Sequence, residues 1–385
     1  MSEKVAVLGA GICGLVASWT LARAGIECVV ISASAGETEQ SSGAWDVEPW
    51  TQALLPSATP PELAEFLSDL GLFRLASAKL QMVVASSSGV LRGAGGVGSG
   101  ILDLSSYAGK NVGVAEVGRD DFDARWLARS FSEQHWAQQT GTRFVVAPLM
   151  GAYETAEANL PLAVFSHLLE NEERSLSVTR SLERLRLTHP DLAVVLGGPW
   201  LGTRLHESSG TGFFASLPLP LFETLHPPEG PWGGRFERAR TALLQRLTIR
   251  HEHARVVEMR EDAEGVTLRL LDMSGTPFAL ERRYSKVIVA TGGVLGGGTE
   301  IKPFAGGAQL GWSIHKPGPE LSSGELGGWD PSLLPRGWLY DDQAAQAVRG
   351  QRVLRSAVSL LGTGTLGRAA ARGRSLALRC LKQDS

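Results

Sequence analysis

The 385-residue sequence contains only three cysteines, Cys13, Cys28 and Cys380. They form no CxxC pair and no metal-ligand spacing, which excludes an iron–sulfur cluster or a cysteine-based zinc site. Three scattered thiols also do not predict a disulfide framework, and they are typical of a reducing compartment. His251 and His253 would share one face of a strand, but no third ligand is near them in the sequence. We therefore expect solvated histidines and no metal.

The chain also lacks a large excess of charge. It has 37 Lys and Arg against 40 Asp and Glu, a net charge of −3, which gives no electrostatic reason to expect nucleic acid as a partner. Residues 5–22 are uncharged, but glycines interrupt them and no basic segment precedes them, so a signal peptide or membrane span is not expected. GxSxG and Walker motifs are absent. These absences favour a soluble cytoplasmic protein.

Glycine, in contrast, is abundant, with 46 residues. Residues 4–8 form an apolar, β-rich run that leads into a GxGxxG motif, a helical segment at 15–24 and a second strand at 27–32. This order predicts the βαβ unit of a dinucleotide-binding fold, in which the first glycine makes a tight turn, the second admits a pyrophosphate and the third permits close helix packing. The expected cofactor contacts from this motif are Gly9, Gly11, Ile12, Cys13 and Gly14.

The acidic residue that usually binds the ribose hydroxyls at the end of the second strand is missing. Ser32 occupies this region, and Glu37 is the first carboxylate after it. Either Ser32 or Glu37 substitutes for the acid, or the adenosine half of the ligand is weakly held or absent, which keeps FMN open beside FAD. The loop that follows contains Ser41, Ser42 and Gly43, whose small hydroxyl side chains suit contact with a pyrophosphate; a surface turn is the alternative.

A late segment, residues 284–293, predicts a buried parallel strand that re-enters the first sheet and ends in Ala-Thr-Gly-Gly. Glycines at such a strand end would pass close to the dinucleotide. A third strand–glycine–helix pattern covers residues 353–382, and its helix N-terminus would stabilise negative charge on a reduced flavin. The further cofactor contacts expected from these regions are Thr291, Gly292, Gly293, Gly362 and Gly364, and Val257, from the segment before them, is a further expected contact.

The resulting fold prediction is mixed α/β. A Rossmann-like FAD/NAD(P)-binding domain with three-layer ββα architecture would comprise residues 1–46 and 251–385, with an inserted cap at 47–250. The cap shows no regular βα alternation, so a second Rossmann-type domain is not expected there. The predicted strands of the middle region lie at 80–85, 111–117 and 142–148, its helices at 121–137, 160–187 and 235–249, and a hairpin follows at 251–271.

The segments that match one known family in order are the glycine motif, 41–46 (SSGAWD), 112–115, 121–130, 165–173, 217–220, the strand ending at Gly293, and 356–362. Taken together, they resemble the B-type subunit of the anaerobic glycerol-3-phosphate dehydrogenase family. The resemblance implies a flavoprotein that oxidises glycerol 3-phosphate, or a similar small alcohol, and passes electrons through a partner towards quinone. It also implies a catalytic flavoprotein subunit and a membrane-associated iron–sulfur subunit as partners, which would place the chain peripherally at the inner membrane. Departures from the family lie in the C-terminal glycine-rich stretch and at 311–342.

Oxidation of a polyol phosphate requires a base near the hydroxyl and cations for the phosphate. The candidates follow Gly293 in a loop-rich segment: Lys302, His315, Lys316 and Arg336. The alternative is a non-catalytic flavin-binding or structural accessory subunit, which the missing ribose acid favours. A nicotinamide-dependent dehydrogenase fits the GxGxxG motif but not the late Ala-Thr-Gly-Gly return.

Overall fold

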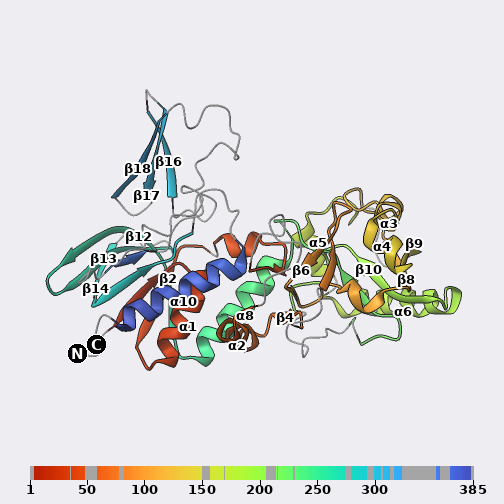
Figure 1. The fold of residues 1–385 in the computed structure, drawn as a ribbon, viewed down its shortest axis with the longest axis horizontal. Coiled ribbons are helices and arrows are strands. Elements are labelled where there is room, and N and C mark those ends of the chain that lie inside the picture. Colours follow the sequence, from red (N-terminus) through yellow and green to blue (C-terminus); the bar gives the residue numbers. More distant parts are fainter. Residues whose placement is uncertain are drawn as a thin grey trace. The chain divides into compact units, whose positions relative to one another are not determined.

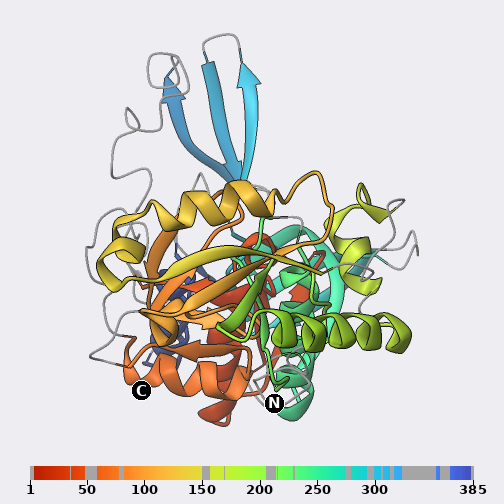
Figure 2. The same cartoon turned by 90° about the vertical axis from the view of Figure 1, so that its right-hand side faces the viewer.

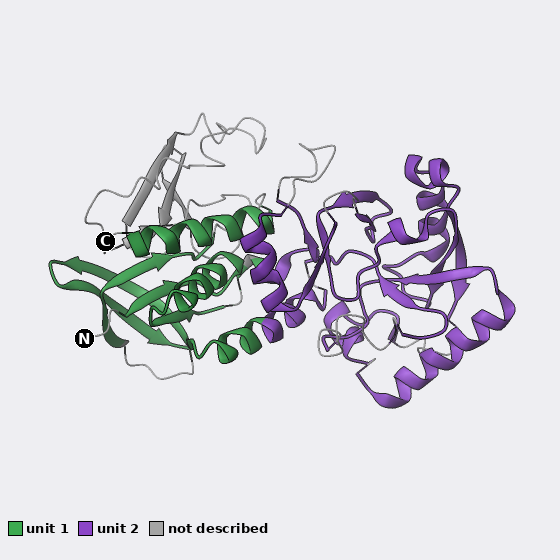
Figure 3. Cartoon of the chain, turned by 60° about the horizontal axis from the view of Figure 1, so that its bottom comes forward, with its two compact units in different colours: residues 1–38, 240–385 green, residues 39–239 purple. Residues whose placement is uncertain are grey.

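The computed structural model divides the chain into two compact units (Figure 3). Unit 1 comprises residues 1–38 and 240–385, and unit 2 comprises residues 39–239; the sequence placed these borders after residues 46 and 250. Unit 1 is therefore built from both ends of the chain. The structure describes residues 4–34, 36–47, 59–77, 82–149, 157–168, 170–204, 214, 216–228, 230–273, 279–292, 299–304, 307–312, 316–322, 353–355 and 365–382.

The core of unit 1 is a set of parallel strands. β1 (Val5–Leu8) leads into α1 (Ile12–Arg23), and the chain returns in β2 (Cys28–Ser32), parallel to β1. β1 and β2 are buried along their whole length, as expected for apolar strands covered on both faces. β15 (Lys286–Val289) pairs in parallel with the other side of β1, which confirms the predicted re-entry of the chain into this sheet.

The same sheet continues into an antiparallel hairpin and a further strand. β12 (Arg250–Asp262) runs parallel to β2, and β13 (Gly265–Asp272) and β14 (Ala279–Tyr284) follow it in antiparallel order. The predicted hairpin is therefore confirmed. The seven-stranded order is β14-β13-β12-β2-β1-β15-β19, where β19 is Val353–Arg355. One hydrophobic cluster joins the side chains of β1, β2 and β15 with those of β12 to β14.

Two helices pack side by side in unit 1, namely α1 and α10 (Leu366–Lys382) (Figure 1). α10 buries residues three or four apart, including Ala370, Gly373 and Ala377, which is the spacing of one helix face. A Cβ on Gly373 would lie 2.0 Å from the carbonyl oxygen of Cys13. The two helix backbones therefore meet at a point where α10 has no room for a side chain larger than that of glycine at position 373.

Unit 2 contains a second parallel sheet, which the sequence analysis missed. Its strands β8 (Asn111–Glu116), β9 (Arg143–Pro148), β10 (Leu192–Gly197) and β11 (Leu221–Glu223) are all parallel, in the order β11-β10-β8-β9. The expectation that residues 47–250 lack βα alternation is wrong.

Helices form the crossovers of this sheet. α3 (Ala124–Ser132) and α4 (His135–Thr140) connect β8 to β9, and α5 (Leu162–Leu168) and α6 (Glu172–Thr188) connect β9 to β10. The strands lie between α3 and α6, as Figures 1 and 2 show. Each predicted helix at 121–137 and 160–187 is two shorter helices, and this breaks the regular alternation along the sequence.

The remaining elements are short, apart from α2 and α8. α8 crosses the border between the two units in the sequence, and β16, β17 and β18 form a separate antiparallel sheet. Within the described residues, no helix combines the length and apolar character needed to cross a membrane. These elements are η1 (Glu37–Gln40), β3 (Ala44–Trp45), α2 (Pro61–Leu70), β4 (Phe73–Leu75), β5 (Met82–Ala85), β6 (Leu91–Ala94), β7 (Gly96–Gly98), η2 (Leu104–Tyr107), α8 (Trp232–Arg246), β16 (Thr299–Phe304), β17 (Gly307–Trp312) and β18 (Lys316–Ser322).

The close crossing of α1 and α10 predicts the effect of Gly373→Ala. Alanine is the better helix former by about 1 kcal/mol, but its methyl group would overlap the backbone of Cys13. We expect the free energy of unfolding, measured with urea, to fall by about 2 kcal/mol. The exposed Ala371→Gly on the same helix is the control, with an expected loss of about 1 kcal/mol from propensity alone. An unchanged or raised stability for Gly373→Ala would contradict the described helix contact.

Candidate functional site

The loop after β1 contains the first glycine of the motif. Gly9 has a φ of +106°, and a Cβ there would lie 2.2 Å from the carbonyl oxygen of Ala290, directly after β15. A Cβ on Gly14 would lie 1.9 Å from the carbonyl oxygen of Gly9, so α1 packs directly on the loop. The backbone of Gly9 therefore contacts Ala290 on one side and α1 on the other. Gly9 makes the tight turn and Gly14 permits the close helix packing, as the motif predicts.

Gly11 has a different environment. It precedes α1 with a φ of −71° and a ψ of 179°, a conformation open to any residue. Among the described residues, only the Oγ1 atom of Thr38 lies within 4 Å of the position a Cβ would take, at 3.1 Å. The absence of a side chain at Gly11 therefore leaves the start of α1 uncovered rather than relieving a backbone collision.

Thr38 closes part of this helix end. The backbone N–H of Ile12 donates a hydrogen bond of 2.9 Å to Thr38 Oγ1, and Thr38 is buried. The first turn of α1 carries no acidic side chain, so the positive end of the helix dipole is not neutralised there. An anion bound at this end would share or replace the Thr38 hydroxyl. Sequence reasoning missed Thr38, because no local motif marks a residue that caps a helix from 26 positions away.

The end of β2 carries neutral polar groups where a carboxylate is usual. Ser32 is buried, and its Oγ lies 2.9 Å from Nε2 of His251. The Nε2 atom of His253 lies 3.0 Å from the carbonyl oxygen of Ala33. β12 brings both imidazoles to β2 because it pairs in parallel with it. Both imidazoles form hydrogen bonds with the end of β2, and of the two histidines expected to be solvated, His253 is exposed and His251 is half-buried.

The other predicted residues divide into four groups. Thr291 and Gly292 directly follow Ala290 and so lie beside Gly9, with Gly292 at a φ of +77°. Val257 lies in β12 at an irregularity of the pairing with β13, beyond the residues of β12 that pair with β2. Lys302 lies in β16 and Lys316 in β18. The predicted residues outside the described part of the chain are Gly293, His315, Arg336, Gly362 and Gly364.

The loop of Ser41, Ser42 and Gly43 lies in unit 2, where packing accounts for its glycine. Gly43 has a φ of +80°, and a Cβ would lie 2.6 Å from Cδ1 of Ile101 and 3.0 Å from Cε3 of Trp232. The carbonyl oxygen of Ser42 accepts a hydrogen bond from the backbone N–H of His226 at 3.0 Å. The predicted role in pyrophosphate binding stays a prediction.

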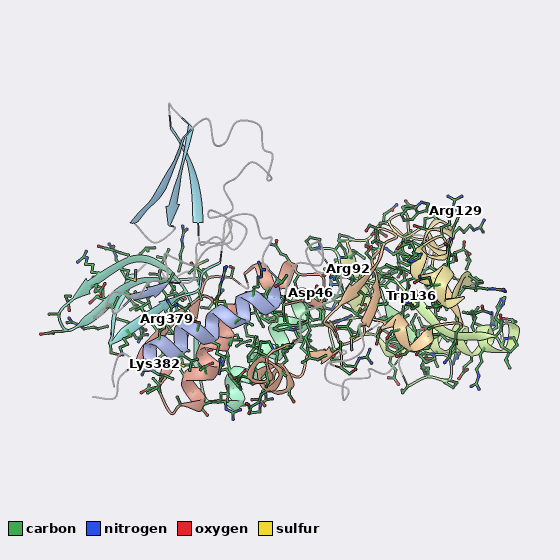
Figure 4. The ribbon with its side chains drawn as sticks, in the orientation of Figure 1. Asp46, Arg92, Arg129, Trp136, Arg379 and Lys382 are labelled. Carbon is green, nitrogen blue, oxygen red and sulfur yellow. The ribbon has the colours of Figure 1, made fainter. Side chains whose placement is uncertain are left out.

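Two ion pairs lie in the same unit as this loop, Asp46–Arg92 and Glu223–Arg235. Asp46, three residues after Gly43, accepts hydrogen bonds from Arg92 at 3.0 Å and from the N–H of Gly95 at 3.2 Å; Asp46 and Arg92 are labelled in Figure 4. Arg235 donates to both carboxylate oxygens of Glu223, at 2.6 and 2.9 Å. Unlike the first pair, the second is fully buried.

His226 completes the second pair as a buried cluster. Its Nε2 atom lies 3.3 Å from Oε2 of Glu223. Burial alone would raise the pKa of Glu223, but Arg235 and His226 lower it to about 2. Burial lowers the pKa of His226, which therefore stays neutral at neutral pH. Sequence reasoning missed these residues because their spacing matches no motif.

No group of three or more His, Cys, Asp or Glu side chains within the described residues could hold a metal ion. The site features that the structure does assemble in unit 1 are an uncovered helix start, a hydroxyl at its edge, and a hydroxyl–imidazole pair at the end of β2. These groups can bind phosphate and hydroxyl oxygens.

Comparison with known proteins gives no family. No family model matches the chain, and no curated protein sequence matches it. Similar solved structures include OxyS anhydrotetracycline hydroxylase from Streptomyces rimosus, at 14% identity over 80% of this chain and 36% of that chain, with a TM-score of 0.28. The 3-ketosteroid delta1-dehydrogenase from Sterolibacterium denitrificans is 14% identical over 76% of this chain and 48% of that chain, with a TM-score of 0.30. A further one is p-nitrophenol 4-monooxygenase PnpA from Pseudomonas putida DLL-E4, at 11% identity over 78% and 44%, with a TM-score of 0.29. This chain spans less than half the length of each, and similarity of this degree assigns it no activity.

The contrast between Gly9 and Gly11 is testable by stability. Gly9→Ala places a methyl group on the backbone of Ala290 and forces a positive φ on alanine, so we expect the free energy of unfolding to fall by about 3 kcal/mol or more. Gly11→Ala meets only a hydroxyl at 3.1 Å and should cost less than about 1 kcal/mol. Equal losses in urea titrations of the two variants would show that the loop is not arranged as described.

The buried Glu223 predicts a loss of stability in acid. Its pKa in the folded chain, about 2, lies below the ordinary value of 4.5, so its stabilisation is present above pH 4.5 and is lost as the pH falls towards 2. Glu223→Gln should lower the stability at pH 7 by about 3 kcal/mol, because Arg235 loses its buried partner. It should also flatten the decline of Tm with acidification. If Tm declined equally with acidification in the parent and in Glu223→Gln, the result would contradict a buried, ionised carboxylate at Glu223.

Proposed function

We propose that the chain is a flavin-dependent oxidoreductase whose unit 1 is a Rossmann-like FAD/NAD(P)-binding domain of three-layer ββα type. The observation that supports this most is the site around Gly11. Strand ends of β1 and β15 touch through Gly9, α1 packs on the same loop, and the start of α1 faces only the hydroxyl of Thr38 among the described residues. A helix N-terminus after such a loop favours a phosphate group.

The residues present fit the two halves of a dinucleotide. The backbone N–H groups that follow Gly11, with the Thr38 hydroxyl, would hold the pyrophosphate, because a missing Cβ at Gly11 permits close approach. Ser32 and His251 would serve the ribose hydroxyls, with a hydroxyl and an imidazole in place of the usual carboxylate. A bound flavin would supply the chemistry of accepting a hydride from an alcohol carbon.

FAD is favoured over a nicotinamide dinucleotide by the late return of the chain to the first sheet. The late strand β15 joins the first sheet beside β1, and Thr291 and Gly292 follow it at the same edge. FMN remains the alternative flavin, because the adenosine side lacks a charged contact.

The resemblance to the B-type subunit of the anaerobic glycerol-3-phosphate dehydrogenase supports a narrower form of the proposal. In this form the chain acts at the cytoplasmic face of the inner membrane with a flavoprotein subunit and an iron–sulfur subunit, and it oxidises glycerol 3-phosphate or a similar small alcohol. The scarcity of cysteine agrees with this, since electrons leaving the flavin would go to a cluster on a partner. A second candidate is a non-catalytic flavin-binding accessory subunit, which the uncharged contact at Ser32 favours.

The cofactor proposal predicts a selective loss of FAD affinity. Gly11→Ala should raise the Kd for FAD by more than tenfold, because the methyl group occupies the position of closest approach, while the FAD-free protein stays folded. Quenching of flavin fluorescence during titration measures the affinity. Thr38→Ser, which keeps the hydroxyl, is the control and should bind FAD like the parent. An unchanged Kd for FAD in Gly11→Ala would show that FAD does not bind at the glycine loop.

A second experiment separates the catalytic from the accessory form. Glycerol 3-phosphate added anaerobically to the flavin-loaded chain should bleach the oxidised flavin absorption if the chain dehydrogenates this alcohol by itself. Glycerol 2-phosphate, which carries the phosphate on the carbon to be oxidised, is the control and should leave the spectrum unchanged. A bound flavin that glycerol 3-phosphate leaves oxidised would select the accessory form.

A further inference from the structure

α6 in unit 2 has two stripes of residues on opposite sides. The inner stripe is apolar, buried and part of the hydrophobic core of unit 2. The outer stripe repeats the same spacing of three and four residues, which keeps its members on one side of a helix, and all its side chains are exposed. α6 covers one face of the unit 2 sheet, so the outer stripe is turned away from the sheet (Figures 1 and 2). The inner residues are Val178, Leu182 and Leu185, and the outer residues are Leu176, Arg180, Glu183 and Leu187.

Leu187 is the most exposed large apolar side chain of the described residues. It is 83% exposed, whereas the other exposed large apolar side chains range from 38% to 49%. Leu176, at the other end of the outer stripe, is 45% exposed. Single exposed leucines are ordinary on a protein surface. These two, however, lie in line along about 16 Å of one helix, so one partner helix can cover both.

The two charged members of the outer stripe are available to a partner. Arg180 and Glu183 are exposed, and no ion pair between side chains of the described residues includes either of them. The remaining charges of α6 are divided between its ends. The first turn carries Glu172 and Glu173, and Arg184 and Arg186 lie towards the end. Arg174 also lies near the start, but it is paired with Glu157 at 2.6 Å. One end of α6 is therefore acidic and the other basic.

Two copies of α6 in antiparallel order match each other at every position of the outer stripe. Leu176 and Arg180 precede the middle of the stripe by as many residues as Leu187 and Glu183, respectively, follow it. Around a two-fold axis through this middle, Leu176 meets Leu187 of the partner subunit, and Arg180 meets Glu183 of the partner subunit. A parallel pair would instead place Arg180 against Arg180 of the partner subunit. The charges therefore favour the antiparallel order.

We propose that the outer stripe of α6 is a self-association surface, on which a second copy of the chain docks through its own α6 in antiparallel order. Contacts between leucines bury apolar surface at both ends of the stripe, and two pairs of Arg180 with Glu183 lie between them. A contact between two single helices buries less than the roughly 1,200 Å² of a stable interface, so the dimer is weak and depends on concentration. The inference concerns unit 2 and does not depend on the flavin proposal.

Charge reversal tests both the surface and its direction. Arg180→Glu places two carboxylates together at each of the two charged contacts, and Glu183→Arg places two guanidinium groups together. Each single variant should therefore bind itself at least tenfold more weakly than the parent. The double variant Arg180→Glu/Glu183→Arg restores opposite charges and should dimerise again. An equimolar mixture of the two single variants also pairs opposite charges at both contacts, and we expect it to form mixed dimers.

The measurement is sedimentation equilibrium of the full chain at concentrations up to about 300 µM, at which weak interfaces associate. The average mass of the parent should rise from that of a monomer towards that of a dimer. Leu187→Gln, which removes an apolar contact without changing the charge, should also raise the Kd at least tenfold. Arg129→Glu is the matched control, because it makes the same charge change at an exposed residue of α3 and should dimerise like the parent.

Three results would overturn the inference. They are a parent chain that stays monomeric over this range, a dimer that both Arg180→Glu and Leu187→Gln leave unchanged, and single variants whose mixture does not associate although the parent does. Circular dichroism shows whether each charge variant keeps its helices. If one does not, Leu187→Gln and the parent decide the question, because the Leu187 side chain is 83% exposed and contributes little to the folded monomer.

Discussion

The fold of unit 1 depends on one backbone contact, the one between Gly9 and Ala290. β1 and β15 lie far apart in the sequence and pair in parallel, so no short turn can hold their register. Any side chain at position 9 would overlap the Ala290 carbonyl group, and any at position 14 would overlap Gly9. This close approach positions both the start of α1 and the end of β15.

The polar groups discussed in the two units differ in how fully the protein itself supplies their hydrogen-bond partners. In unit 1 the start of α1 has one hydroxyl partner, Thr38, and no acidic side chain in its first turn, which leaves a positive dipole end suited to phosphate. In unit 2 the carboxylate of Glu223 is matched within the protein, by Arg235, His226 and the N–H of Leu201. This pairing holds the imidazole of His226 in place through Nε2, and Nδ1 is buried without a hydrogen-bond partner among the described residues. Only the arrangement in unit 1 leaves a polar group suited to a ligand that carries phosphate oxygens.

Local patterns made part of this structure predictable. β1, α1, β2 and the hairpin of β12 and β13 follow from apolar runs, glycine spacing and a turn, and the re-entry of β15 follows from an apolar run that ends in glycines. The parallel sheet of unit 2 was not predictable in this way, because its crossovers are split helices of unequal length. Thr38 was not predictable because its hydrogen-bond partner, Ile12, is 26 positions away. Glu223 and Arg235 were not predictable because their spacing matches no motif. The requirement for glycine at position 43 comes from its positive φ and from the side chains of Ile101 and Trp232, which no pattern near Gly43 reveals.

The central claim is that the loop at Gly9 to Gly14, together with the end of β15, holds a flavin dinucleotide. The most direct measurement is the visible absorption spectrum of the purified chain, followed by release and chemical identification of any bound cofactor. The account predicts the two absorption bands of an oxidised flavin and the release of FAD in a one-to-one ratio with the chain. A colourless protein that takes up neither FAD nor FMN on reconstitution would contradict it.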